Sequence, residues 1–518
     1  MMPTVSILIL NYNSMAHLQA NLDALTRLDY PADRLEILLV DNASSDGSVA
    51  WVAAHYPAVR LVQNGANLGF AAGNNAGAAA ATGEWLAILN PDIRVRPDWL
   101  TEMIRPTQQD PGVTAVAAKM LNWEGTAVDF ADAAINFMGW GNQPGLGSAQ
   151  LAQFDTAKPL LFPCGGAMLI RRDLFLESGG FDPDYFAYFE DVDLGWRLWL
   201  LGHKVMYAPR AIVYHRHHGS WQSVASAKVW LLSERNTLLT LLKNYGDANL
   251  ASILPAALLL TLQRAFLDAQ PDPTHFGLPA APMITPWRYY AYELWQLLRY
   301  GRLLELLQRA FAELHRRLRR TGPPPIKLPQ AWQQPTADGR FQMPDIALSR
   351  LLAGRDVLRQ WDAALSKRAA VQARRRRRDQ EIFPLFQQPL LSNFGDAQFI
   401  YAMNQVIAKF KLVKLFAGHK KWAPPSPDVQ ALSLALSRRL LRLMDEAFAL
   451  SQADEDAFRL TGAAPQPVYA VPHRCAALLA HANHWLWKLP DGDLRTVLTY
   501  LQQQIDQWEE GYHDDNQS

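Results

Sequence analysis

The first third of the chain alternates short apolar segments with segments of helical periodicity, and this alternation limits the possible folds more than any other feature. Short runs rich in Val, Ile and Leu are typical of strands buried on both faces of a sheet. Four such runs are expected as strands, at residues 5–10, 36–40, 59–63 and 84–89. Because helical segments separate them, we predict an α/β fold with a mostly parallel sheet covered by helices.

Polar side chains stand where three of these strands end. Asn11 follows the first strand, Asp41 the second, and Asp92 comes just after the fourth. In open parallel sheets, ligands bind beyond the carboxyl ends of the strands. The sequence therefore predicts a ligand site that these side chains share.

The rest of the chain contains extended, helical and proline-rich segments that mark expected domain boundaries. Residues 163–171 and 204–215 are expected as extended chain, with a helix at 189–202 between them, and helical periodicity dominates after residue 220. A proline-rich segment at 321–329 reads as a linker. We expect an α/β domain at 1–222, a helical region at 223–322 and a mainly helical C-terminal region at 323–518.

Composition excludes several classes of protein. A chain of 518 residues is too long for one ordinary domain. The net charge of +1 provides no basic field for nucleic acid. Two distant cysteines, Cys164 and Cys475, form neither a disulfide framework nor a zinc site, which fits a reducing cytoplasm.

No signal peptide or clear membrane-spanning helix is expected. The apolar start lacks a basic region and a cleavage site, and the best candidate span, residues 250–262, is too short and contains Pro255. Residues 287–320 combine aromatic, leucine and arginine side chains, which fits either a membrane-interfacial helix or a core helix with a solvated basic end. The arginine run at 374–378 fits a solvated face or an anionic-lipid contact.

Four positions are candidates for chemistry. Asp92 offers a hard oxygen ligand for Mg²⁺ or Mn²⁺, although an Asp after Asn90-Pro91 is also a common turn residue. Asp41 suits a hydrogen bond from a ribose or a base, or again a turn.

Glu190 and Asp191 follow an aromatic run, where a carboxylate with a raised pKa suits a general base. Acidic residues are also favoured at any helix N-terminus. His215 ends a predicted strand in the sequence HRHH, where a metal ligand and a surface histidine are both consistent with the pattern.

The order of the motifs resembles that of a known family. From the N-terminus the motifs are NYN, DNASSDGS, NLGFAAGNN, LNPD, GGAMLIRRDLF, GGFD, FAYFEDVDLGWR and VYHRHHGS. A later segment, SERNTLLTLLKNYG, carries a weaker similarity to the same family. This order resembles the family 2 glycosyltransferases of the GT-A fold, especially the rhamnosyltransferase-like branch. The resemblance covers residues 5–220 and implies a nucleotide-sugar-binding sheet domain.

The resemblance also assigns roles. Asp191 matches the general base that deprotonates the acceptor hydroxyl, with Glu190 supporting it. Asn90-Pro91-Asp92 stands in the place of the family's Asp-x-Asp metal motif, so that Asp92 and His215 are the expected ligands of Mg²⁺ or Mn²⁺. The residues expected to bind the nucleotide sugar are Asn11, Asn13, Asp41, Asn67, Gly69, Asn74, Asn90, Gly165 and Gly166.

The implied activity is an inverting transfer from a nucleotide-sugar donor, dTDP-rhamnose or a UDP-hexose, to a glycan or lipid-linked acceptor in cell-surface polysaccharide synthesis. Its implied location is the cytoplasm, with peripheral contact at the inner face of the plasma membrane. Two enzyme classes fit less well, because neither the basic Gly-rich loop of a sugar-nucleotide pyrophosphorylase nor the G-x-G-x-x-G of a Rossmann dehydrogenase follows the first strand. The remaining alternative is a membrane-bound scaffold with an inactive transferase domain.

Overall fold

The computed structural model describes residues 2–216, 226–279, 333–417 except 338 and 395, 423–447 and 468–514. The expected domain boundaries at 222/223 and 322/323 and the amphipathic segment 287–320 lie outside these residues. The chain forms two compact units. The first comprises Met1–Leu250 together with Arg359–Leu391, and the second takes most of the remaining chain.

The first unit is built on a ten-stranded mixed sheet with the order β10-β12-β6-β11-β4-β1-β2-β3, with β5 beside β12 and β7 beside β6. Its parallel block consists of the four strands predicted from the apolar runs: β1 (Val5–Asn11), β2 (Leu35–Asp41), β3 (Arg60–Gln63) and β4 (Trp85–Leu89). β1 lies between β2 and β4. The strand order therefore reverses beside β1, which is where such sheets leave a crevice for a ligand.

The second half of the sheet is mixed. Its longer strands are β6 (Val113–Asn122), β11 (Ala167–Arg171) and β12 (Lys204–His215). β11 runs antiparallel to both β4 and β6, whereas β12 runs parallel to β6. The short strands are β5 (Ile93–Val95), β7 (Val128–Phe130), β8 (Ala134–Ile135), β9 (Gly141–Asn142) and β10 (Lys158–Pro159). The prediction of an α/β fold with a mostly parallel sheet of the GT-A type and a helical C-terminal region is confirmed.

Helices pack against this sheet through buried apolar side chains. α3 packs on β1 and β2, and α4 packs on β6 and β12. The helices of the first unit before residue 250 are α1 (Met15–Leu25), α2 (Ser48–His55), α3 (Gly69–Ala80), α4 (Trp99–Gln109), α5 (Arg172–Glu177), α6 (Glu190–Leu200) and α7 (Ser226–Asn244), with 3₁₀ turns η1 (Ala32–Arg34), η2 (Leu151–Phe154) and η3 (Pro183–Tyr185).

Residues from the C-terminal half complete the first unit. They form α12 (Trp361–Ala373), α13 (Asp379–Ile382) and η6 (Phe383–Phe386), and α12 packs against α7. In the arginine run 374–378, Arg374, Arg376 and Arg378 are exposed as expected for a solvated face, whereas Arg375 and Arg377 are partly buried. Arg377 donates to the carbonyls of Gly202 and His203 at 2.9 and 2.7 Å. These carbonyls follow the C-terminal end of α6, where the helix dipole favours a cation, so the run stabilises α6.

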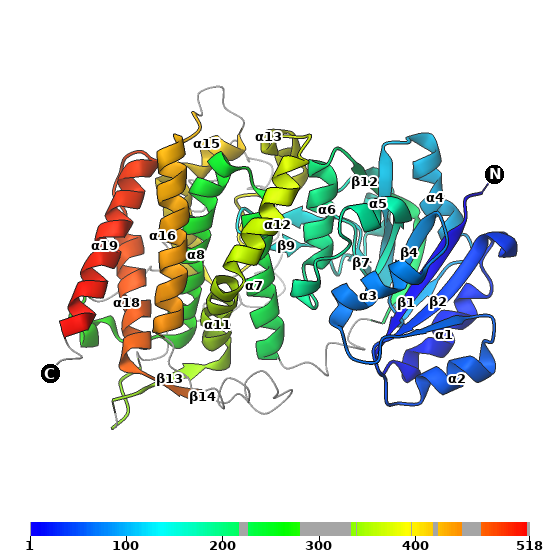
Figure 1. Cartoon of the computed structure of the whole chain (residues 1–518), viewed down its shortest axis with the longest axis horizontal. Helices are drawn as coiled ribbons and strands as arrows, with labels where there is room; N and C mark the ends of the chain where they lie inside the picture. The colour runs from blue at the N-terminus through cyan, green and yellow to red at the C-terminus, as the bar shows by residue number, and fades with distance from the viewer. Residues whose placement is uncertain are drawn as a thin grey trace, which may run out of the picture. The chain divides into compact units, whose positions relative to one another are not determined.

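The second unit is helical. In Figure 1 its long helices α16, α18 and α19 run side by side. Its elements are α11 (Asp345–Arg359), α14 (Ala397–Lys409), α15 (Leu412–Phe416), α16 (Pro427–Glu446), α18 (His473–Trp487), α19 (Leu494–Asp514), η5 (Pro273–Phe276) and the paired strands β13 (Phe341–Pro344) and β14 (Val468–Val471).

The apolar segment at 250–262 belongs to a longer helix than expected. Helix α8 (Asp247–Ala269) continues through Pro255. Among the described residues it is the one helix long and apolar enough to cross a membrane, and its apolar stretch is almost wholly buried within the protein. Core helices share these properties, so the helix by itself does not distinguish a span from a core element.

Candidate active site

The first part of the site joins the ends of β1 and β2. The Asn11 amide donates to Asp41 Oδ1 at 2.8 Å and to Ser48 Oγ at 2.8 Å, and both Asn11 and Asp41 are buried. The second Asp41 oxygen accepts the backbone N–H of Ser44 at 3.1 Å. The structure therefore brings Asn11 and Asp41 together as the sequence predicts, in one hydrogen-bonded cluster.

Two loops beside this cluster carry further predicted residues. Asn13 has a positive φ of 53°, and its Oδ1 accepts the N–H of Ser45 at 2.8 Å, which ties the loops after β1 and β2 together. Asn67 Oδ1 accepts the N–H of Gly69 at 3.0 Å at the start of α3. Asn74 lies apart from these residues, because its fully buried amide bonds to the Phe70 carbonyl one turn earlier in the same helix.

The second part of the site lies beyond β4. Asp92 is 6% exposed and its Oδ2 lies 3.4 Å from His215 Nε2 at the end of β12. The other ring nitrogen, Nδ1, contacts Asp129 on β7 through a short hydrogen bond. The backbone of Asn90 is fixed to the Gly166 carbonyl at 2.8 Å. The sequence prediction that Asp92 and His215 meet is thus geometrically satisfied, whereas Asp129 is a site residue that sequence reasoning missed.

The charge of His215 follows from these neighbours. Burial lowers the pKa of His215, but the hydrogen bonds and charges of Asp129 and Asp92 outweigh that effect and raise the pKa to about 9. The imidazole is therefore an imidazolium at neutral pH when no cation competes for its nitrogen.

The residues fit a divalent cation. Asp92 supplies a carboxylate oxygen, and His215 presents Nε2 on the same side while Asp129 holds Nδ1. A carboxylate on the far nitrogen of a metal-binding histidine is the common arrangement that fixes the ring's orientation. Within the described residues no group of three or more His, Cys, Asp or Glu side chains forms a complete metal cage. Two protein ligands suit Mg²⁺ or Mn²⁺ shared with phosphate oxygens and water.

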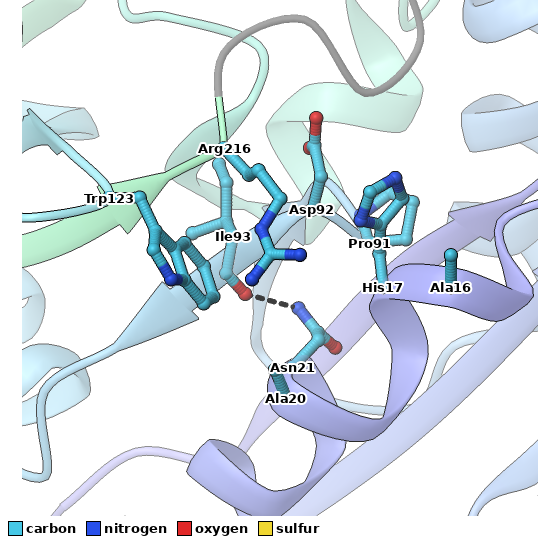
Figure 2. Close-up of a pocket in the computed structure, with 9 residues that line it drawn as sticks. All are labelled: Ala16, His17, Ala20, Asn21, Pro91, Asp92, Ile93, Trp123 and Arg216. Carbon is cyan, nitrogen blue, oxygen red and sulfur yellow. Dashed lines mark hydrogen bonds between the residues drawn. The ribbon is translucent and has the colours of Figure 1, made fainter.

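A pocket opens beside Asp92 (Figure 2). It is lined by Ala16, His17, Ala20, Asn21, Pro91, Asp92, Ile93, Trp123 and Arg216. Asn21 donates to the Ile93 carbonyl at 2.7 Å and so anchors the loop that carries Asp92. The Arg216 guanidinium lies 4.4 Å from the ring centre of Trp123. A cation and a buried carboxylate thus border the same small pocket.

The third part of the site is the acidic pair at the start of α6. Asp191 Oδ2 accepts the N–H of Gly165 at 2.8 Å, and Oδ1 accepts the N–H of Val192 at 2.8 Å. Burial nevertheless raises the pKa of Asp191, and burial together with the charge of Asp191 raises the pKa of Glu190 well above its usual value. Glu190 is 6% exposed, and its Oε2 has no hydrogen-bond partner. The pair therefore holds a proton at a higher pH than ordinary carboxyls do.

Two glycines let the chain pass close to this pair. A Cβ on Gly165 would lie 3.3 Å from the Phe70 ring and 3.5 Å from the Asp191 Cβ. A Cβ on Gly166 would lie 3.2 Å from the Asn90 amide. Gly165 and Gly166 thus connect the acidic pair to the loop of Asp92.

Comparison with known proteins agrees with this geometry. Residues 6–179 match the family model described as glycosyl transferase family 2. The chain is 28% identical over 250 residues to the N-acetylglucosaminyl-diphospho-decaprenol L-rhamnosyltransferase of Mycobacterium tuberculosis, covering 44% of this chain and 80% of that protein. We identify the N-terminal domain as a family 2 glycosyltransferase. The expected enzyme class and rhamnosyltransferase-like branch are confirmed.

The chain is also similar to a second curated protein and to a solved structure. The O-antigen biosynthesis protein RfbC of Myxococcus xanthus is 29% identical over 250 residues, which is 44% of this chain and 19% of that protein. Among solved structures, GalNAc-T7 with UDP, GalNAc and Mn²⁺ is 18% identical with a TM-score of 0.39 over 49% of this chain and 51% of that one. Both of the curated relatives match 44% of this chain, and the family model matches residues 6–179.

Proposed function

We propose that the protein is an inverting glycosyltransferase of polysaccharide synthesis that uses dTDP-rhamnose or a UDP-hexose as donor and a lipid-linked or glycan hydroxyl as acceptor. The observation that carries the proposal is the convergence of three groups at one end of the sheet: the Asn11–Asp41 cluster, the Asp92–His215 pair and the Asp191 carboxylate. The named activity of the M. tuberculosis relative supports the choice of donor and acceptor class.

In this mechanism the Asn11–Asp41 cluster binds the nucleoside, since its buried carboxylate accepts hydrogen bonds from ribose or base. Asp92 and His215 would hold a divalent cation, which would supply positive charge to neutralise the leaving diphosphate. Asp191 accepts the proton of the acceptor hydroxyl as that oxygen attacks the anomeric carbon and the nucleotide leaves from the opposite side. A single displacement of this kind inverts the anomeric configuration.

Calorimetric titration with dTDP and UDP, each with and without Mn²⁺, tests the metal and donor assignments. We expect one nucleotide to bind in a Mn²⁺-dependent manner, and Asp92→Asn to remove that dependence. Asp98→Asn is the matched control, because Asp98 directly precedes α4 and its carboxylate, 40% exposed, pairs with Arg96 at 3.0 Å. Binding that ignores Mn²⁺ in the parent protein contradicts the metal site.

The role of Asp191 as general base is tested by measuring turnover. Release of dTDP from dTDP-rhamnose, or of UDP from a UDP-hexose, is followed in the presence of a polyprenyl-diphosphate-linked N-acetylglucosamine acceptor. Asp191→Asn should abolish release while leaving nucleotide binding intact, because the amide cannot take the proton. A folded protein that binds neither nucleotide would favour the alternative of a scaffold with an inactive transferase domain.

We also propose that the enzyme works in the cytoplasm at the inner face of the membrane, where a lipid-linked acceptor is reached. The support is the lipid-linked acceptor in the name of the M. tuberculosis relative and the aromatic and basic composition of residues 287–320. Flotation with anionic liposomes tests this directly. Protein that remains entirely in the soluble fraction refutes the peripheral contact.

A further inference from the structure

The loop that leads into the acidic pair has an uncommon backbone. Phe186, Tyr188 and Phe189 all have positive φ values, of 62°, 73° and 65°. At Phe186 (φ 62°, ψ −61°) the N–H of Ala187 donates to the Tyr185 carbonyl at 2.7 Å, which forms a γ-turn of the rare, strained type. Bulky L-residues seldom adopt such angles, and they persist only where surrounding contacts impose them.

The contacts that impose this backbone come from α7. The Asn236 amide nitrogen lies 3.1, 2.9 and 2.7 Å from the carbonyl oxygens of Tyr185, Ala187 and Tyr188. The adjacent Arg235 donates from one nitrogen to the carbonyls of Asp184 and Tyr185, both at 2.8 Å. Asn236 is fully buried, so no water replaces its donors.

The other side of the loop rests on α3. The N–H of Ala71 donates to the Phe186 carbonyl at 3.1 Å. Gly69 approaches so closely that a Cβ there would lie 2.5 Å from both the Phe186 ring and its carbonyl oxygen. The γ-turn is therefore held between the polar face of α7 and the start of the helix that follows the predicted nucleotide loop.

We propose that Asn236, assisted by Arg235, is a positioning residue for catalysis: its amide fixes the γ-turn and thereby sets where α6 begins and where the Asp191 carboxylate stands. Phe189 is the last residue before α6, so any relaxation of the loop shifts Glu190 and Asp191 directly. Asn236 lies beyond residues 6–179 that match the family model. The inference rests on the proposed role of Asp191 as the base.

The test is Asn236→Asp, which keeps the shape of the side chain but replaces its N–H donors with an oxygen facing the carbonyls. We expect kcat for nucleotide release to fall by about 100-fold, the typical effect of misplacing a catalytic group by roughly 1 Å. The Kd for dTDP or UDP with Mn²⁺ should stay within about twofold, because the side chains of Asn11 and Asp41 bond to each other and to Ser44 and Ser48 rather than to this loop.

Thr240→Val is the matched control. Thr240 lies one turn further along α7, is fully buried, and bonds to the Tyr185 hydroxyl at 2.8 Å but not to the loop backbone. It should lower thermal stability while leaving kcat within about twofold. If Asn236→Asp does not fold, Arg235→Lys replaces it. Arg235 bonds to the two carbonyls through one nitrogen and to Asn236 Oδ1 through Nε at 2.9 Å. A single ammonium cannot keep both sets of contacts, and an approximately tenfold loss of kcat is expected.

The outcomes separate the two proposals. Full turnover by Asp191→Asn refutes the base assignment and this inference together. Loss of turnover by Asp191→Asn with normal turnover by Asn236→Asp refutes the positioning role alone. A fall in kcat that is equal in Asn236→Asp and Thr240→Val also refutes it, because both effects then follow from lost stability.

Discussion

Replacement of Lys243 by Met should destabilise the catalytic unit strongly. The Lys243 ammonium on α7 lies 2.6 Å from Asp182 Oδ2 and 3.0 Å from Asp193 Oδ1. All three side chains are at most 7% exposed. Methionine retains most of the apolar stem and removes the cation, so the variant isolates the cost of leaving two buried carboxylates with one counter-charge fewer.

The expected loss of stability depends on the counter-charges that Asp182 and Asp193 keep after Lys243 is replaced. Removing one partner of a buried ion pair costs about 3–5 kcal/mol. Asp193 keeps Arg197 at 2.8 Å and Asp182 keeps Lys367 at 2.5 Å. We therefore expect the lower end, about 3 kcal/mol. For a unit of this size, that loss lowers the melting temperature by roughly 6–12 °C.

Differential scanning calorimetry of the full chain at several pH values is the assay. Burial raises the pKa of Asp182, but Lys243 and Lys367 outweigh it and hold the pKa well below the usual range. A depressed folded-state pKa stabilises the protein above the unfolded pKa of about 4, and that stabilisation is lost as the pH falls below it. The deficit of Lys243→Met should therefore be largest near pH 7 and shrink below about pH 4.

The control is Lys367→Met. Lys367 reaches the same Asp182 but is 35% exposed, so its removal should cost only about 1 kcal/mol. Two results contradict the role of the Lys243 ion pairs: a loss of stability in Lys243→Met no larger than that in Lys367→Met at pH 7, or a loss of stability in Lys243→Met that grows as the pH falls.

Three further substitutions or conditions have defined outcomes. Gly69→Ala should lower the free energy of unfolding by about 2–3 kcal/mol, because the φ of +76° and the contact with Phe186 both oppose a Cβ. Gly47→Ala is the control: its φ is +81° but its surroundings are open, so it should lower the free energy of unfolding by only about 1 kcal/mol. Urea unfolding measures both. Arg377→Ala should lower the free energy of unfolding by about 1–3 kcal/mol, because the carbonyls of Gly202 and His203 lose their hydrogen-bond donor. An unchanged urea midpoint contradicts the role of Arg377 in stabilising the end of α6. The acid limb of the pH–kcat/KM profile should lie above the ordinary pKa of an aspartate, because burial raises the pKa of Asp191; a limb at or below that value contradicts its role as the base.

The sequence predicts the core of the sheet because a strand buried on both faces leaves a direct signal. The four apolar runs became β1 to β4, and parallel order then brings Asn11 and Asp41 to one edge, in register with each other. Asp92 also follows from this logic, since β4 pairs with β1 in parallel. Local pattern and topology together therefore predict where these side chains lie.

Residues supplied from distant segments leave no such signal. Asp129 sits in the three-residue strand β7, and it meets His215 only because β7 and β12 both pair with β6. Asn236 lies on the polar face of a helix, where helical periodicity does not reveal which polar residue holds a backbone turn. The contact of Arg377 with the carbonyls after α6 also leaves no such signal, because those carbonyls lie more than 170 residues away in the sequence.

The interleaved order of the two units has a consequence for synthesis. The chain leaves the catalytic unit at Leu250 and supplies its last helices only at Arg359–Leu391. At about 5–20 residues per second, a ribosome needs roughly 5–22 s to make the intervening stretch. During that interval the nascent domain lacks α12 and the arginines beyond α6, so it exposes the apolar side of α7. We expect the emergence of Arg359–Leu391 from the ribosome, rather than completion of the sheet, to mark the point at which the nascent enzyme becomes resistant to protease.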